Sequence, residues 1–203
     1  MQQALALAET GIGRCAPNPA VGCVIVKDHK VVGAARTQND GRPHAETRAL
    51  AQAANHAKGA TAYVTLEPCV HHGQTPPCAE ALIADGIAKV VIACADPYPK
   101  VNGGGIAALK TAAIEVELGD GRNEAIEINR GFFSRIKRLR PWVTLKIATS
   151  SDGFIAKEDG TSKWITGETA RTNGHQLRSR NDAILTGSGT CLLYTSPSPR
   201  DRG

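Results

Sequence analysis

The sequence predicts an α/β protein, in which helices cover both faces of a mixed β-sheet. Three observations predict this class. Two β-rich runs at residues 21–26 and 30–35 are separated by a short turn that contains Asp28-His29, which favours an antiparallel hairpin. Later apolar runs of strand length alternate with helical patterns, which is typical of parallel connections. Gly and Pro mark the junctions between these runs, as expected for connecting loops.

The first two thirds of the chain contain the clearest elements. Residues 44–58 are rich in Ala, Leu, Gln and Glu, which are good helix formers, and Gly59 is a natural stop. Pro77-Cys78 can open another helix that ends at Gly86. The remaining expected elements are helices at 2–10 and after Gly105, and strands at 62–66, 89–93 and 114–118.

A helical connector at residues 121–139, closed by Pro141, separates this part from a second one. We predict a first domain at 1–120, the connector at 121–140 and the start of another domain at 141–190. Its expected elements are strands at 142–147 and 182–186 and a helix at 166–178 with Thr166 as N-cap. Residues 191–203 change to Ser, Pro and Arg, and we predict an unrelated processing or cloning remnant there.

Composition excludes several classes of protein. The 203 residues carry a mild net charge of +5 and six cysteines in no disulfide-framework spacing. No signal peptide or membrane span is recognisable, because the apolar runs are only as long as strands. We therefore expect a cytoplasmic protein with no membrane partner, while its oligomeric state is left open, a homo-oligomer included.

A basic run follows the first domain and includes Arg130, Arg135, Lys137, Arg138 and Arg140. Such a run could attract nucleic acid or phosphorylated substrates. We favour a solvated helix face without a nucleic-acid partner, because no aromatic stacking platform is interleaved with the charges.

The strongest chemical signal consists of His44, Cys69 and Cys78. One imidazole and two thiols are the three protein ligands that a catalytic zinc ion needs when its fourth position is open. A structural zinc ion would need a fourth ligand, for which only His71 and His72 lie nearby in the sequence.

Glu46 stands two residues after His44 and is the expected catalytic group. Zinc lowers the pKa of water to about 7, which supplies hydroxide near neutral pH. A carboxylate beside it can take a proton from water and deliver it to a departing amine. This arrangement, with Pro68 before Cys69, resembles that of zinc nucleobase deaminases, although eight residues separate the two cysteines here.

Longer motifs narrow the resemblance. They are Pro17-Asn18-Pro19-Ala20-Val21-Gly22-Cys23, Thr65 through Cys78, Asp96-Pro97, Leu145-Lys146 through Asp152-Gly153, and Ser162-Lys163-Trp164-Ile165-Thr166. With these motifs the chain resembles the bifunctional deaminase–reductases of riboflavin biosynthesis, from about residue 2 to Thr190. This chain departs from the family pattern at two positions: it has Tyr98 where the family usually has Asn, and Gln74 where a basic residue is common.

The resemblance implies a three-layer sandwich with the cytidine-deaminase-like fold, followed by the start of a dihydrofolate-reductase-like domain. It implies a small-molecule substrate, a phosphoribosylaminopyrimidine, whose ring amine is hydrolysed with zinc as cofactor. It also implies NADPH as the cofactor of the second domain, whose activity we expect to be absent here. Implied substrate contacts are Asn18, His71, His72, Ser162 and Arg178, and implied NADPH contacts are Ala148, Trp164 and Thr190.

Two alternative functions stay open at this point. One is another zinc deaminase, acting on a free base, a nucleoside or a tRNA adenosine. The other is a nucleic-acid-binding module held by structural zinc, which the basic run would suit.

Overall fold

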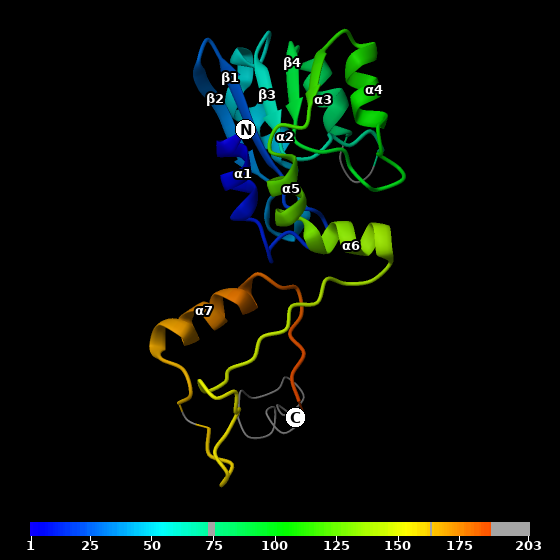
Figure 1. The fold of residues 1–203 in the computed structure, drawn as a ribbon. Helices are drawn as coiled ribbons and strands as arrows, with labels where there is room; N and C mark the ends of the chain where they lie inside the picture. Colours follow the sequence, from blue (N-terminus) through cyan, green and yellow to red (C-terminus); the bar gives the residue numbers. More distant parts are fainter. Residues whose placement is uncertain (73–75, 163, 188–203) are drawn as a thin grey trace, which may run out of the picture. The chain divides into compact units, whose positions relative to one another are not determined.

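The computed structural model describes residues 1–72, 76–162 and 164–187 of the chain (Figure 1). The chain divides into two compact units, Met1–Lys146 and Ile147–Gly203. The finer domain boundaries that the sequence predicts, at residues 120, 140 and 190, stay predictions.

The first unit is built on a five-stranded sheet in the order β2-β1-β3-β4-β5. β1 pairs antiparallel with β2 and β3, while β3, β4 and β5 run parallel to one another. The predicted hairpin and mixed sheet are therefore confirmed. The strands are β1 (Gly22–Lys27), β2 (Lys30–Arg36), β3 (Thr61–Val64), β4 (Lys89–Ile92) and β5 (Glu115–Leu118).

Helices cover both faces of this sheet (Figure 1). A side chain at Gly22 of β1 would collide with the backbone of α1, whereas one at Gly33 of β2 would collide with the backbone of α2. Two glycines thus let helices approach the sheet closely on opposite faces. The helices flanking the sheet are α1 (Gln2–Glu9), α2 (Ala45–Ala53), α3 (Cys78–Ala84) and α4 (Gly104–Thr111).

The connector is two helices, α5 (Arg122–Ile128) and α6 (Arg130–Arg138), instead of the single helix predicted at 121–139. The break lies at Asn129, whose φ and ψ of −104° and 21° depart from helical values. Its buried side chain accepts a hydrogen bond from Ala20 N at 2.8 Å and donates one to Ala20 O at 2.9 Å. This tertiary contact explains the interruption, which helix propensity does not encode.

The described part of the second unit contains one helix, α7 (Glu168–Ser179), and no strand. Gly167 occupies its N-cap position, so the prediction of Thr166 as N-cap is wrong. The strands predicted at 142–147 and 182–186 are also absent, since neither segment has a strand to pair with in the described residues. Their apolar side chains are exposed, with Leu145 at 81% and Leu185 at 100%. No helix among the described residues is long and apolar enough to cross a membrane.

Candidate metal centre and active-site cavity

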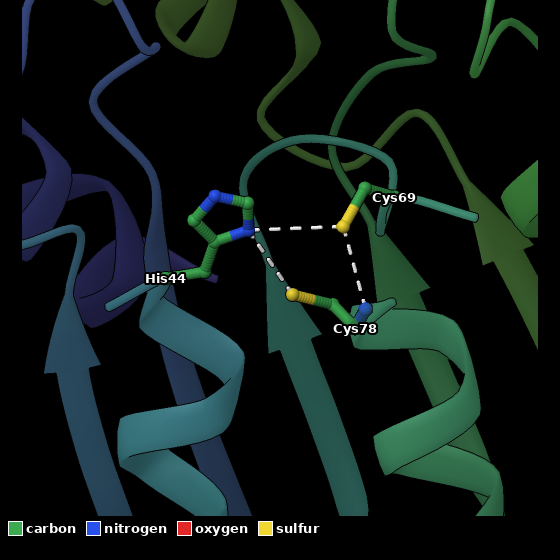
Figure 2. A group of neighbouring side chains, drawn as sticks. All are labelled: His44, Cys69 and Cys78. Atoms are coloured by element: carbon green, nitrogen blue, oxygen red, sulfur yellow. Dashed lines mark hydrogen bonds between the residues drawn. The ribbon is translucent and has the colours of Figure 1, made fainter. Parts of the chain in front are cut away.

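His44, Cys69 and Cys78 converge in the first unit, as the sequence predicts (Figure 2). Their ligand atoms all lie within 4.8 Å of one another. His44 Nδ1 is 3.2 Å from Cys78 Sγ and 3.7 Å from Cys69 Sγ. One nitrogen and two sulfurs at these separations fit the donor set of a zinc ion with an open fourth position. Among the described residues no further His, Cys or carboxylate joins this group.

Local structure explains why these side chains face one another. His44 is the N-cap residue of α2, and Cys78 is the first residue of α3, with Pro77 before it. Cys69 lies in the loop that follows β3, and its sulfur accepts a hydrogen bond from the Cys78 backbone N–H at 3.3 Å. The predicted positions of His44 and Cys78 at helix starts are confirmed.

The protonation of the three groups is mutually dependent. Hydrogen bonds from the Cys78 thiol and from His44 lower the pKa of Cys69 to about 4, against the effect of burial. The hydrogen bond with Cys69 raises the pKa of His44, and the shared hydrogen bond and burial raise that of Cys78. The lowered pKa favours the thiolate of Cys69, which is the form that binds metal ions.

Glu46 lies in the first turn of α2 and is 4% exposed. Burial is the largest cause that raises its pKa, to about 7, and the positive charge of His44 opposes this shift. A carboxyl group with a pKa near neutrality can both accept and release a proton at physiological pH. The site thus contains, in addition to its three metal-binding atoms, a carboxyl group suited to proton transfer.

These residues border a cavity of about 300 Å³, a volume at the lower end for small-molecule sites. His44, Glu46 and Cys69 line it together with residues from several loops and from α6. The other residues of its wall include Asn18, Thr37, Arg42, Glu67, His71, Asp96, Tyr98, Phe132 and Arg135.

Glu67 is a site residue that we did not predict from the sequence. Its buried carboxylate accepts four backbone hydrogen bonds, of 2.9 to 3.2 Å, from Asp96, Gly103, Gly105 and Ile106. It therefore fixes the loop between β4 and α4 as well as the N-terminus of α4. A side chain at Gly105 would collide with the Pro68 carbonyl, which makes glycine necessary for this close approach. The sequence signal was the Glu67-Pro68-Cys69 motif itself, which we used only to recognise the cysteine.

The predicted substrate contacts in the first unit differ in position. Asn18 lines the cavity, and its Nδ2 donates to Gly41 O at 2.8 Å. His71 lines it too, with its ring edge-on to Tyr98, and its buried Nδ1 has no hydrogen-bond partner among the described residues. His72 is exposed outside the cavity wall, where its Nε2 lies 3.3 Å from Glu80 Oε1.

The predicted contacts of the second unit lie on its surface or outside the described residues. Trp164 is 69% exposed and lies beneath the Arg171 guanidinium, while Ser162 and Arg178 are exposed and Ala148 is half-buried. Thr190 is outside the described residues. The assignments of all these residues to NADPH or substrate stay predictions.

Two family models match the chain. The cytidine and deoxycytidylate deaminase zinc-binding region matches residues 1–94, and the RibD C-terminal domain matches residues 141–200. The first match agrees with the metal centre. The second reaches beyond residue 190 into the segment that we predicted to be an unrelated remnant.

Curated relatives and solved structures cover nearly the whole chain. Riboflavin biosynthesis protein RibD of Escherichia coli is 50% identical over 95% of this chain and 52% of that protein. Acinetobacter baumannii RibD, form 1, superimposes with a TM-score of 0.89 at 49% identity, over 95% of this chain and 54% of that one. A Thermotoga maritima diaminohydroxyphosphoribosylaminopyrimidine deaminase/5-amino-6-(5-phosphoribosylamino)uracil reductase superimposes with a TM-score of 0.90 at 42% identity. This match covers 97% of this chain and 56% of that one.

These matches confirm the cytidine-deaminase-like fold of the first part and fit the start of a dihydrofolate-reductase-like domain after it. The chain spans about half the length of the curated relatives it matches. Three observations point to the same type of protein: the sequence identity to RibD, the two family matches and the His-Cys-Cys group. The chain is therefore of the RibD type: it carries a deaminase zinc-binding region and, after it, a segment that matches the RibD C-terminal domain.

Proposed function

We propose that the first unit catalyses the zinc-dependent hydrolytic deamination of 2,5-diamino-6-(5-phosphoribosylamino)pyrimidin-4(3H)-one. The observation that carries this proposal is the placement of three metal-binding atoms within 4.8 Å of one another, at a cavity that His44, Cys69 and the buried Glu46 line. The name of the Thermotoga maritima relative supplies the substrate class.

His44, Cys69 and Cys78 would hold the zinc ion, which when bound lowers the pKa of water toward neutrality. As water adds to the ring carbon, Glu46 takes one of its protons and delivers it to the neighbouring ring nitrogen. The same carboxyl group then moves the remaining hydroxyl proton to the exocyclic nitrogen, the carbon–nitrogen bond breaks, and ammonia departs while the carbonyl group forms. Burial at 4% exposure keeps competing solvent away from the Glu46 carboxyl group during both transfers.

His71 supports binding of a polar ring in this cavity. Its Nδ1 is buried and has no partner within the described protein, so it is available to form a hydrogen bond with a polar group of a ligand in the cavity. Asn18 and His71 are accordingly our proposed substrate contacts in the wall of the cavity. The test for His71 is a rise in KM for the His71→Ala variant.

The decisive experiment is metal analysis combined with ammonia release from a small panel of substrates. We expect about one zinc ion per chain, because the site offers one ligand set. We expect ammonia release from the diaminopyrimidine phosphoriboside and little from cytidine, deoxycytidylate or a tRNA adenosine. Release from one of the other compounds alone would overturn the substrate, and metal-free protein with full activity would overturn the mechanism.

We also propose that the protein works in a reducing compartment, the cytoplasm. All five cysteines of the described residues are free thiols, and two of them belong to the metal centre. Thiols persist where glutathione and thioredoxin keep them reduced. Fractionation of cells followed by thiol labelling of the protein would test this location.

A further inference from the structure

Two side chains of α6, Phe132 and Arg135, reach the wall of the active-site cavity. The Arg135 guanidinium lies 5.7 Å from the centre of the Phe132 ring, and its Nη2 donates to Pro17 O at 3.1 Å. Pro17 lines the same cavity. Arg135 is thereby held at the cavity, although the residue itself is exposed.

Two buried hydrogen bonds at its start and a partly buried one in its second half hold α6 in position. Asn129, directly before α6, binds both the N–H and the C=O of Ala20, which follows the Pro17-Asn18-Pro19 segment of the cavity wall. At the other end, Ser134 Oγ donates to Arg140 O at 3.0 Å. The helix is consequently anchored to the segment whose residues border the cavity.

Charges are distributed by depth in this cavity. The carboxylate residues are buried, with Glu46 at 4%, Glu67 at 3% and Asp96 at 7% exposure. The two arginines of the wall are more accessible, since Arg42 is half-buried and Arg135 is exposed. The carboxylate residues of the wall are therefore the buried ones, and the two arginines are its more accessible charged residues. Such a distribution favours a ligand with an anionic group at the cavity mouth.

We propose that Arg135, together with Arg42, binds the phosphate of the substrate at the mouth of the cavity, so that α6 forms part of the deaminase site. This proposal rests on the proposed function, which it deepens by assigning the residues that recognise the phosphate. A guanidinium group suits this role because its fork of N–H donors matches phosphate oxygens. The aminopyrimidine ring then extends from the phosphate toward Glu46.

The test compares Arg135→Gln with Arg138→Gln, a matched control that removes one charge from an exposed residue of the same helix outside the cavity wall. Ammonia release is measured on the phosphorylated pyrimidine riboside and on its dephosphorylated form. We expect Arg135→Gln to raise KM for the phosphorylated compound about 10- to 100-fold, with kcat and the constants for the dephosphorylated compound nearly unchanged. Arg135→Lys should restore part of the loss, because it keeps the charge without the fork.

A structural role of Arg135 through Pro17 would instead impair both compounds equally, and that result overturns the proposal. An equal effect of Arg138→Gln would overturn it as well, because general attraction would then explain the loss.

An NMR titration of the zinc-loaded protein with ribose 5-phosphate measures phosphate binding without deamination. It therefore tests the phosphate site independently of the proposed function. We expect the affinity for ribose 5-phosphate to fall at least about tenfold in Arg135→Gln. Ribose without the phosphate should bind neither the wild type nor this variant. Dependence of ribose 5-phosphate binding on Arg135 without any ammonia release would refute the deaminase assignment alone. Normal ammonia release with unchanged binding and KM in Arg135→Gln would refute the phosphate site alone.

Discussion

Two buried glutamates in the same cavity have different environments and therefore different roles. Glu67 has both carboxylate oxygens occupied by four backbone N–H groups, so it holds a loop and a helix end in place. Glu46 has its pKa raised to about 7, chiefly by burial, and is thereby suited to proton transfer. Residue type alone does not distinguish these roles.

Replacing Glu46 by Gln should lower kcat for deamination by about 10²- to 10⁴-fold, because the amide cannot carry a proton between water and the leaving nitrogen. Zinc content should stay unchanged, since the three metal-binding atoms are untouched. Ammonia release and metal analysis on the same preparation measure both. Glu80→Gln, which alters an exposed carboxylate in the first turn of α3, is the control and should retain activity. Full turnover in Glu46→Gln would exclude its proton-transfer role.

Asp96→Asn should change how stability depends on pH. Burial, and then the negative charges of Glu67 and Cys69, raise the pKa of Asp96 from 3.8 to about 6, against a hydrogen bond from the Tyr98 N–H. A raised pKa in the folded state contributes stability below about pH 4 that is lost as pH rises through about 6. Asn does not titrate, and its carbonyl can still accept the Tyr98 hydrogen bond.

The difference in unfolding free energy between Asp96→Asn and the wild type should therefore change by about 1 kcal/mol in favour of the variant as pH rises from about 4 to about 7. This value is smaller than the full pKa shift would give, because the cavity admits solvent. Urea unfolding at a series of pH values measures this difference. A constant difference across that range would show that Asp96 has no raised pKa.

At the scale of elements, Asn129 determines how the connector meets the site. The interruption between α5 and α6 lets one amide side chain bind both backbone groups of Ala20. Ala20 is buried, so water cannot readily replace these bonds. The connector thereby belongs to the first unit, in which α6 contributes to the cavity wall.

Asn129→Ala should lower the free energy of unfolding by about 1–3 kcal/mol, because the buried N–H and C=O of Ala20 lose their partners. Chemical denaturation of the zinc-loaded protein measures the change. Asn123→Ala, at an exposed position of α5, should alter stability by less than about 0.5 kcal/mol. Equal effects of both substitutions would show that the Ala20 contact does not hold the connector in place.

At the scale of the whole molecule, the two units differ in how they bury apolar residues. The first has a continuous core that includes Ile25, Val64, Leu82 and Ile92. In the second, Phe154, Ile155 and Leu185 are exposed at 63% or more. Without a paired sheet, a segment with strand-like composition cannot satisfy its backbone or bury its side chains. The described part of the second unit thus contains no sheet on which its predicted cofactor contacts could be arranged.

We expect no NADPH oxidation by this chain when the deaminated pyrimidine is supplied. The predicted contacts Ser162, Trp164 and Arg178 are exposed, and the described part of the second unit has no sheet to arrange them. Absorbance at the nicotinamide band, recorded alongside ammonia release, measures both activities in one sample. Sustained NADPH oxidation that depends on the pyrimidine would contradict this expectation.

The sequence by itself determined the strands and the main helices of residues 1–120 and the donor set of the metal centre. Runs such as 89–93 are short and apolar enough to specify a buried strand, and β4 forms there. The sequence also allowed the site residues to be identified, because a nearby helix start or loop motif places each of them and their chemistry follows from residue type. These residues are His44, Glu46, Cys69 and Cys78.

Only the tertiary structure decided which distant groups meet. Three contacts join segments that lie between 29 and 118 residues apart in the sequence. They are the backbone N–H groups that donate to Glu67, the hydrogen bonds of Asn129 with Ala20, and the hydrogen bond of Arg135 with Pro17 at the cavity. The described residues after 141 form no strand, because a strand needs a partner to pair with, which the composition of a segment does not supply. Local spacing is fixed by the geometry of helix and strand, whereas contacts between remote segments depend on how the whole core packs.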